Sequence, residues 1–230
     1  MEIKFLLIEK DFLYSHLLFI ALCILVLIIP FPNLIGVKLF ILVLSYNLLI
    51  LVVGLIRNHT NWLKLYYFVL FISIFQIFPD WYLSAQLDIL VFPEDGFFKI
   101  GTVSAYMLGL WVIPLFIIGF ISLRIKERYS IKSAYLSAIL LSLIIFGLAE
   151  QSMWVFSWYP QNVFLLFDHL AVYIIIPEIL LGFSTFYLFL KFMDTKISYK
   201  IALAFVIMLL YLGAANFFYF LIEEILLFSL

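Results

Sequence analysis

Glu178 is the residue of this sequence best suited to proton chemistry, because it directly follows Pro177 near the centre of the apolar stretch 169–190. An ionisable side chain at such a depth in a membrane is costly and normally faces a cavity or a partner. No Lys or Arg lies at a comparable depth in any apolar stretch, so loss of hydration favours an uncharged carboxyl. Such a carboxyl can donate a proton as a general acid. The structural alternative is a neutral carboxyl hydrogen-bonded to Asn47 or Asn216 of another helix.

Glu150 is a second candidate acid, near the end of the apolar stretch 132–154. Trp154 and Trp158 follow at spacings of four and eight, which places them on the helical face of Glu150 if the helix continues. A carboxyl against indole rings is either a desolvated acid or a charge that attracts a cation to the rings. The alternative is an interfacial aromatic belt, with Glu150 reaching the headgroup water.

Asp168 and His169 open the next apolar stretch, one turn before Tyr173. Asp168 is expected to cap this helix by accepting backbone N–H bonds, and His169 has the chemistry to shuttle protons. A catalytic role for both residues remains open beside Glu150 and Glu178. No tight ligand spacing such as His-x-x-x-His occurs, so we predict no metal site.

Asp80 opens a polar connection that runs to Lys99. With Pro79 in its first turn, a short helix would place Asp80, Ser84 and Asp88 on one face, as an amphipathic lid or a simple interfacial helix. Aromatic residues make up 20% of the chain, and aromatic faces bind flat polyenes and stabilise cations. The candidate substrate-binding residues are Trp111, Trp154, Trp158, Tyr173, Asn216 and Asp80.

The composition of the 230 residues is that of a membrane protein, with 67% hydrophobic and 12% charged residues. Soluble chains are about half apolar and about a quarter charged. Disorder requires low hydrophobicity, a disulfide scaffold requires more than the single Cys23, and nucleic-acid binding is disfavoured by 13 Lys and Arg against 14 Asp and Glu. The sequence therefore predicts a polytopic helical membrane protein.

Seven stretches are long enough to span a bilayer, and prolines or glycines fall near most of their ends. We predict one all-α domain over residues 1–230, with spans at about 12–30, 34–56, 62–79, 100–122, 132–154, 169–190 and 201–222. Eleven of the 13 Lys and Arg lie on one side of this topology. By the positive-inside rule the N-terminus is cytoplasmic and the C-terminus lies on the opposite side. A rhodopsin is excluded by this orientation and because no lysine follows Lys200.

Two parts of the chain resemble each other at an offset of 63 to 64 positions, which predicts a parallel repeat of the third and fourth helices in the fifth and sixth. Chance similarity between apolar segments is the alternative. The matching pairs are Ala85-Gln86 with Ala149-Glu150, Val91-Phe92 with Val155-Phe156, Ile113-Pro114 with Ile176-Pro177, and Gly119-Phe120 with Gly182-Phe183. Glu150 and Glu178 stand where the first unit has Gln86 and Leu115, so the second unit has gained carboxyl groups.

Residues 75–190 resemble the small seven-helix carotenoid enzymes of the lycopene cyclase type, which are built from repeated helix units. The resemblance rests on the stretch from Asp80 through Phe92-Pro93, Gly96 and Ile100-Gly101 to Ile113-Pro114, and on the stretch from Trp154 to Pro177-Glu178 and Gly182. The family's paired carboxylates are replaced here by Val103-Ser104-Ala105-Tyr106, and Glu178 has no adjacent acid. The resemblance implies protonation of a polyene double bond by a membrane carboxyl, with Glu178 and Glu150 carrying the chemistry, without a soluble cofactor.

Three functions remain open from the sequence. An enzyme of carotenoid or isoprenoid-lipid metabolism predicts an apolar cavity that opens to lipid, with Glu178 on its wall. A non-catalytic lipid-binding or assembly subunit predicts a hydrogen-bonded Glu178 and no cavity. A small transporter predicts a polar path to both faces, although the inner half has few polar side chains. The expected partner is a membrane lipid or a carotenoid or isoprenoid ligand, and not a nucleic acid.

Overall fold

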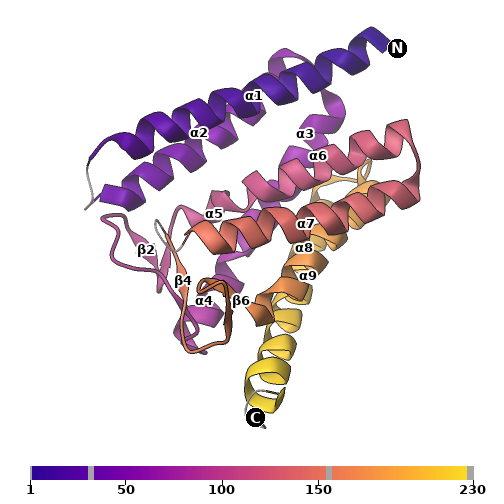
Figure 1. Cartoon of the computed structure of the whole chain (residues 1–230). Coiled ribbons are helices and arrows are strands. Elements are labelled where there is room, and N and C mark those ends of the chain that lie inside the picture. Colours follow the sequence, from indigo (N-terminus) through magenta and orange to yellow (C-terminus); the bar gives the residue numbers. More distant parts are fainter. Residues whose placement is uncertain (1, 31–33, 154–156, 227–230) are drawn as a thin grey trace.

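The computed structural model describes residues 2–30, 34–153 and 157–226, which form a helical bundle with short strands gathered at one end (Figure 1). We call this end the strand end. The helices are α1 (Glu2–Ile28), α2 (Ile35–Ile56), α3 (Thr60–Phe75), α4 (Ile77–Ala85), α5 (Met107–Leu110), α6 (Val112–Arg128), α7 (Ile131–Met153), α8 (Val172–Phe192), α9 (Ile197–Tyr219) and the π-helix η2 (Phe220–Leu226). The strands are β1 (Leu90–Val91), β2 (Lys99–Ile100), β3 (Val103–Ser104), β4 (Tyr159–Pro160), β5 (Leu165–Leu166) and β6 (Leu170–Ala171).

Seven helical segments of the described chain are long and apolar enough to cross a membrane, which confirms the predicted number of spans. They are Leu7–Ile28, Ile35–Ile56, Thr60–Ala85, Met107–Arg128, Ile131–Ser152, Val172–Phe192 and Ile197–Leu226. The described chain is mostly helical, as predicted, and its long connections add short strands that the sequence did not indicate. Backbone N–H and C=O groups in the long connections need partners, and short antiparallel pairs supply them.

Two of the spans are interrupted three residues before a proline. Pro79 has no N–H for the Phe75 carbonyl, and α3 gives way to α4 at Gln76. Pro114 likewise accompanies the break at Trp111 between α5 and α6. The third span therefore continues to Ala85 instead of ending at residue 79, as the sequence had led us to expect.

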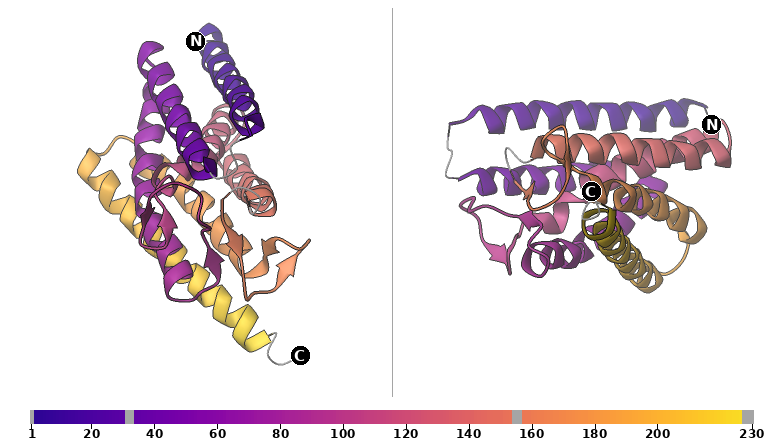
Figure 2. Two further views of the ribbon diagram at one scale, coloured as in Figure 1. Left: turned by 90° about the vertical axis from the view of Figure 1, so that its left-hand side faces the viewer. Right: turned by 60° about the horizontal axis from the view of Figure 1, so that its bottom comes forward.

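Helix α3 lies inside the bundle, where it packs against α2, α6 and α9. The pairs α6–α7, α7–α8 and α8–α9 pack side by side, and α1 lies against α2 at one edge of the bundle (Figure 2). Trp62, at the start of α3, is buried and donates an indole hydrogen bond to the Ile50 carbonyl at 2.7 Å. This central helix therefore holds α2, α6 and α9 together, and it leads directly into α4, which carries the first of the acids discussed below.

Charged side chains hold the elements together at the end opposite the strands. Asp11 of α1 is buried and lies 2.8 Å from His59 Nε2 and 3.5 Å from Arg57 Nε. These contacts fix α1 to the connection between α2 and α3. Lys64 of α3 hydrogen-bonds to Asp194, and its ammonium lowers the pKa of that exposed carboxyl.

The strand end is built by the two longest connections of the bundle. Each forms a small hairpin, β2 with β3 and β5 with β6. The two connections are joined by β1 and β4, which pair antiparallel with Leu90 opposite Pro160. Gly101 turns the first hairpin at a φ of +64°, and an added Cβ there would lie 2.6 Å from the Trp81 ring. The strands thus cover the ends of α4 and α7 (Figure 2).

Gly182 permits the close approach of α8 to α7, and we expect Gly182→Ala to destabilise the bundle. An added Cβ would collide with Ser142 Oγ, which already donates to the Ala138 carbonyl at 2.6 Å. Such overpacking costs about 1–3 kcal/mol, and small residues are what allow membrane helices to pack closely. Thermal unfolding in detergent measures the loss. Gly147→Ala is the control, because a Cβ on that α7 glycine meets nothing within 4 Å. A variant at Gly182 as stable as the wild type would contradict the argument.

Candidate functional site

Three carboxylic acids from three helices converge near the strand end. Asp80 of α4 and Glu178 of α8 are each 2% exposed, and Glu150 of α7 is also buried. Glu178 interacts electrostatically with both Glu150 and Asp80. None of the ion pairs in the described part of the chain includes any of the three. Ionised carboxyls cannot share a dry site without a counter-charge, so this cluster is suited to holding and moving protons.

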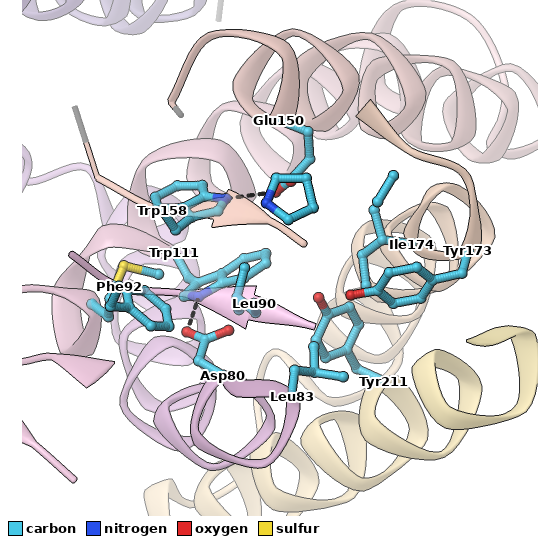
Figure 3. Close-up of a pocket in the computed structure, with 13 residues that line it drawn as sticks. Asp80, Leu83, Leu90, Phe92, Trp111, Glu150, Trp158, Tyr173, Ile174 and Tyr211 are labelled. Atoms are coloured by element: carbon cyan, nitrogen blue, oxygen red, sulfur yellow. Dashed lines mark hydrogen bonds between the residues drawn. The ribbon is translucent and has the colours of Figure 1, made fainter. Parts of the chain in front are cut away.

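Two indole N–H groups fix the orientation of two of the acids. Trp111 Nε1 donates to Asp80 Oδ2 at 3.2 Å, and Trp158 Nε1 donates to Glu150 Oε1 at 3.0 Å (Figure 3). Trp111 stands at the break between α5 and α6, where its side chain faces α4. Trp158 lies beyond the end of α7, just before β4. It therefore reaches Glu150 from outside that helix, and the predicted continuation of the α7 face as far as Trp158 is wrong.

A small cavity of about 20 Å³ lies between Asp80 and Glu150. Tyr173 of α8 and Tyr211 of α9 point their hydroxyl groups into it, and Trp111 and Trp158 form part of its wall (Figure 3). Its other lining residues are Leu83, Leu90, Phe92, Met107, Pro160, Ala171 and Ile174.

A large cavity of about 180 Å³ lies between α6 and α7. Its floor is buried and consists of Trp111, Phe146, Glu150, Trp158 and Glu178. Its rim is half-buried and apolar, and consists of Leu110, Ile113, Pro114, Ile117, Ile145 and Ala149. The neighbouring outer face of α7 carries Ile144 and Leu148, which are strongly exposed. The cavity therefore opens toward the side of the bundle that lipid would cover.

Glu178 has no hydrogen-bond partner among the described residues. The side-chain amides of Asn47 and Asn216, which the sequence offers as its partners, hydrogen-bond to backbone carbonyls instead. Asn47 donates to the carbonyls of Val43 at 2.8 Å and Gly109 at 3.2 Å, and Asn216 donates to the Leu212 carbonyl at 2.8 Å. The structural alternative drawn from the sequence is therefore wrong, and the carboxyl faces the large cavity.

Glu178 also lies closer to the strand end than the sequence suggested. Helix α8 begins at Val172, because residues before it form the hairpin of β5 and β6. Glu178 is thus about 9 Å from the start of the helix, at a rise of about 1.5 Å per residue. It therefore lies in the strand-end part of its span, as the other two acids do in theirs, instead of at mid-span.

Asp168 and His169 lie apart from the cavities. Asp168 is exposed, with a φ of +69° in the turn of the β5–β6 hairpin, and His169 is half-buried beside it. Ala171 is the N-cap of α8 and no side chain caps that helix, so the predicted capping role of Asp168 is wrong. Neither residue lines the small or the large cavity.

Asp80 is part of the site and not of a lid. It lies inside α4 and faces the core, whereas Ser84 is half-buried and Asp88 lies beyond the helix at a φ of +55°. The predicted common face of these three residues is wrong, because α4 continues the third span and ends at Ala85. Trp154 lies outside the described residues. Asn216 lines neither cavity.

Sequence reasoning missed Tyr211, Phe146 and Gln76. Tyr211 and Phe146 lie in spans whose faces are all apolar, so no periodic pattern marks the inward side. Gln76 is fully buried one turn before Asp80, and its amide has no hydrogen-bond partner in the described chain. Its position within an apolar stretch was an available signal. Among the described residues, no group of three or more His, Cys, Asp or Glu is arranged to hold a metal ion.

The two long connections are joined beside the site by Tyr106 and Ser157, whose hydroxyls share a hydrogen bond of 2.6 Å. Burial raises the pKa of Tyr106 to about 12, so this hydroxyl stays neutral at any physiological pH. On the surface, Gln161 Nε2 donates to Asp88 Oδ1 at 2.8 Å. These contacts fix the segment that carries Trp158 against the segment that precedes Trp111.

Residues 77–222 match a protein family described as "Domain of unknown function (DUF6989)". The chain belongs to the DUF6989 family. The match begins at α4 and contains the three acids and every lining residue of the small and the large cavity. The site is thus a feature of the DUF6989 region, and α1, α2 and α3 lie outside it. No curated protein and no solved structure matches the chain.

Proposed function

We propose that this protein is an integral-membrane enzyme that protonates a carbon–carbon double bond of an isoprenoid or polyene lipid, with Glu178 as the general acid. The observation that carries the proposal is an unpartnered buried carboxyl on the floor of an apolar cavity. A carboxyl in such a position is poised to donate its proton to whatever occupies the cavity. An apolar rim selects a hydrocarbon as that occupant.

The floor of the large cavity suits a carbocation. The Trp111 and Phe146 rings lie 5.6 Å apart, and Trp158 completes an aromatic floor around the acids. Aromatic faces attract cations, and most strongly where water is excluded. Protonation by Glu178 would place the positive charge on the lipid beside these rings. Glu150 lines the same cavity and would be the one ionised carboxyl of the cluster, with its charge stabilised by the Trp158 N–H. It would then remove a proton from an adjacent carbon, leaving an isomer of the starting lipid.

The volume of the large cavity limits how much of the lipid enters. Sites for whole small molecules occupy about 300–1,000 Å³. A space of about 180 Å³ holds one end of a long chain, and the rest would lie in the bilayer beyond the rim. The reaction would therefore take place at a terminal group of the lipid. A non-catalytic lipid-binding subunit is disfavoured by the cavity and by the unpartnered Glu178.

We place the strand end on the non-cytoplasmic side. In support, Arg57, Lys64, Arg124, Arg128 and Lys191 lie in or near the helix ends opposite the strands. Clusters of Lys and Arg normally remain in the cytoplasm. The C-terminus would then lie outside.

We also infer that the site arose by duplication of a helix–strand–hairpin–helix unit. The order α4, β1, hairpin β2–β3, α5–α6 recurs as α7, β4, hairpin β5–β6, α8. The equivalent strands β1 and β4 pair antiparallel, as strands related by a two-fold axis would. In such a repeat the second unit carries Glu178 and Glu150, and the first contributes Asp80.

Expression in an isoprenoid-producing host tests the proposed function. We expect lipid and pigment extracts to show one acyclic isoprenoid reduced and an isomer of identical mass gained, because the proton given by Glu178 is balanced by the proton removed. Cells carrying the empty vector are the control, and membrane fractions verify the amount of protein. An unchanged isoprenoid profile at confirmed expression would contradict the proposal.

A further inference from the structure

The small cavity has the size and the lining of a water site. A cavity needs about 10–15 Å³ and two to four polar partners to hold one water molecule, and this one measures about 20 Å³. Its polar groups are the carboxyls of Asp80 and Glu150 and the hydroxyls of Tyr173 and Tyr211 (Figure 3). Neither tyrosine hydroxyl has a hydrogen-bond partner among the described residues. Four groups from four helices thus converge on a space that fits one water.

Glu150 connects the small cavity to the large one, since it lines both. Trp111 and Trp158 also line both cavities, so their rings form the partition between them. Their N–H groups are directed at Asp80 and Glu150, and the ring faces remain to separate the two spaces. Because Glu150 reaches both spaces, its carboxyl can carry a proton across this partition. A water molecule could cross only by displacing the indole rings.

We propose that the small cavity binds one water molecule, which relays protons between Asp80 and Glu150 and so exchanges the proton of Glu178 with the strand-end solvent. In one transfer the Asp80 carboxyl gives its proton to the water oxygen, while the water gives one of its own protons to the Glu150 carboxylate. The water is regenerated, and one proton has moved. Glu178 shares the floor of the large cavity with Glu150, and it accepts this proton once it has given its own away, either to a substrate or back along the same path. A side-chain rotation brings the two carboxyls together for the transfer.

The relay opens toward the strand end. Leu90 and Pro160, which pair in β1 and β4, form the wall of the small cavity on that side, and both are half-buried. Asp88 and Gln161 lie just outside this wall and bond to each other there. A carbocation in the large cavity would be kept away from the water in the small cavity, because the two spaces are in contact only at the indole partition. The use of the relay in catalysis depends on the proposed function, whereas the water site itself does not.

Infrared spectroscopy of the purified full-length protein in lipid nanodiscs tests the relay without any substrate. The carboxyl bands of Asp80, Glu150 and Glu178 are assigned from the variants that replace each acid by its amide, and their rates of deuteration in D₂O are measured. We expect Asp80→Asn to slow deuteration of the Glu178 band by about tenfold or more, since one hydrogen-bonded step of the path is removed. Tyr211→Phe is expected to slow it as well, because it removes one partner of the water. Asp88→Asn, outside the cavity, is the matched control.

Deuteration of Glu178 that is equally fast in the wild type, Asp80→Asn and Tyr211→Phe would overturn the relay. Tyr173→Phe keeps the ring and repeats the measurement if Asp80→Asn does not fold. A wild-type spectrum without a protonated Glu178 band would instead overturn the proposed general acid. In that case the dependence of Glu150 deuteration on Asp80 still decides whether the water site exists.

Discussion

Glu178→Gln is expected to lower the rate of product formation by about 10²- to 10⁴-fold, the usual contribution of a general acid. Glutamine has nearly the same shape as glutamic acid but cannot give up an acidic proton. The side chain faces the large cavity without a hydrogen-bond partner in the described chain, so the folded bundle loses little by the exchange. Product formation in membranes, measured per amount of folded protein, provides the readout.

Glu223→Gln is the matched control for this experiment. Glu223 accepts hydrogen bonds of 3.0 Å from the Phe164 backbone N–H and lines neither cavity, so its replacement should leave the rate unchanged. Turnover by Glu178→Gln within about twofold of the wild type, far below the effect of losing a general acid, would remove this residue from the mechanism.

Ala149→Trp is expected to close the large cavity and lower kcat/KM for the lipid. Ala149 lies on the half-buried rim, beside the floor residue Glu150. An indole at this position would occupy much of the 180 Å³ available to a substrate. Changes of one methylene in an apolar pocket already alter discrimination by about 10- to 200-fold, so a larger loss is expected here. The amount of isoprenoid that co-purifies with the protein should fall in parallel.

Leu148→Trp separates cavity filling from a general effect of tryptophan in α7. Leu148 is 65% exposed on the outer face of the same helix and lines neither cavity. Its variant should retain the wild-type kcat/KM and the co-purified lipid. Equal losses in both variants would show that the large cavity is not the substrate site.

The seven spans could be predicted from the sequence because the length of an apolar stretch is a local property. The wrong predictions for Asp80 and Glu178 have the same cause. In both, the boundary between a helix and the connection next to it was placed at the wrong residue. Pro79 looked like the end of a helix, although it removes only the bond to Phe75 and the helix continues after a short break. The start of α8 was placed too early, because the hairpin that precedes it depends on pairing between β5 and β6.

The acids Glu150 and Glu178 were identified because a carboxyl in an apolar stretch is conspicuous in any sequence. Their convergence with Asp80 could not be derived in the same way. It depends on how α4, α7 and α8 are placed relative to one another, which is a tertiary feature that the sequence of each helix does not specify. The hydrogen bond from Trp158 to Glu150 depends on the position of β4, which pairs with β1 and is therefore a tertiary feature.

The hydrogen bond between Trp111 and Asp80 joins two residues that leave the ribosome at different times. Membrane helices are made in chain order, so the third span reaches the translocon before Trp111, Glu150 and Tyr211 have been synthesised. An Asp at the centre of an isolated helix costs about 2.5–3.5 kcal/mol on insertion scales. Near the strand end that cost is smaller, since the carboxyl can stay hydrated at the interface until its indole partner arrives. The position of Asp80 five residues before the end of its span thus lets the segment insert while the carboxyl is still hydrated, and the carboxyl loses that water only when the later helices pack against it.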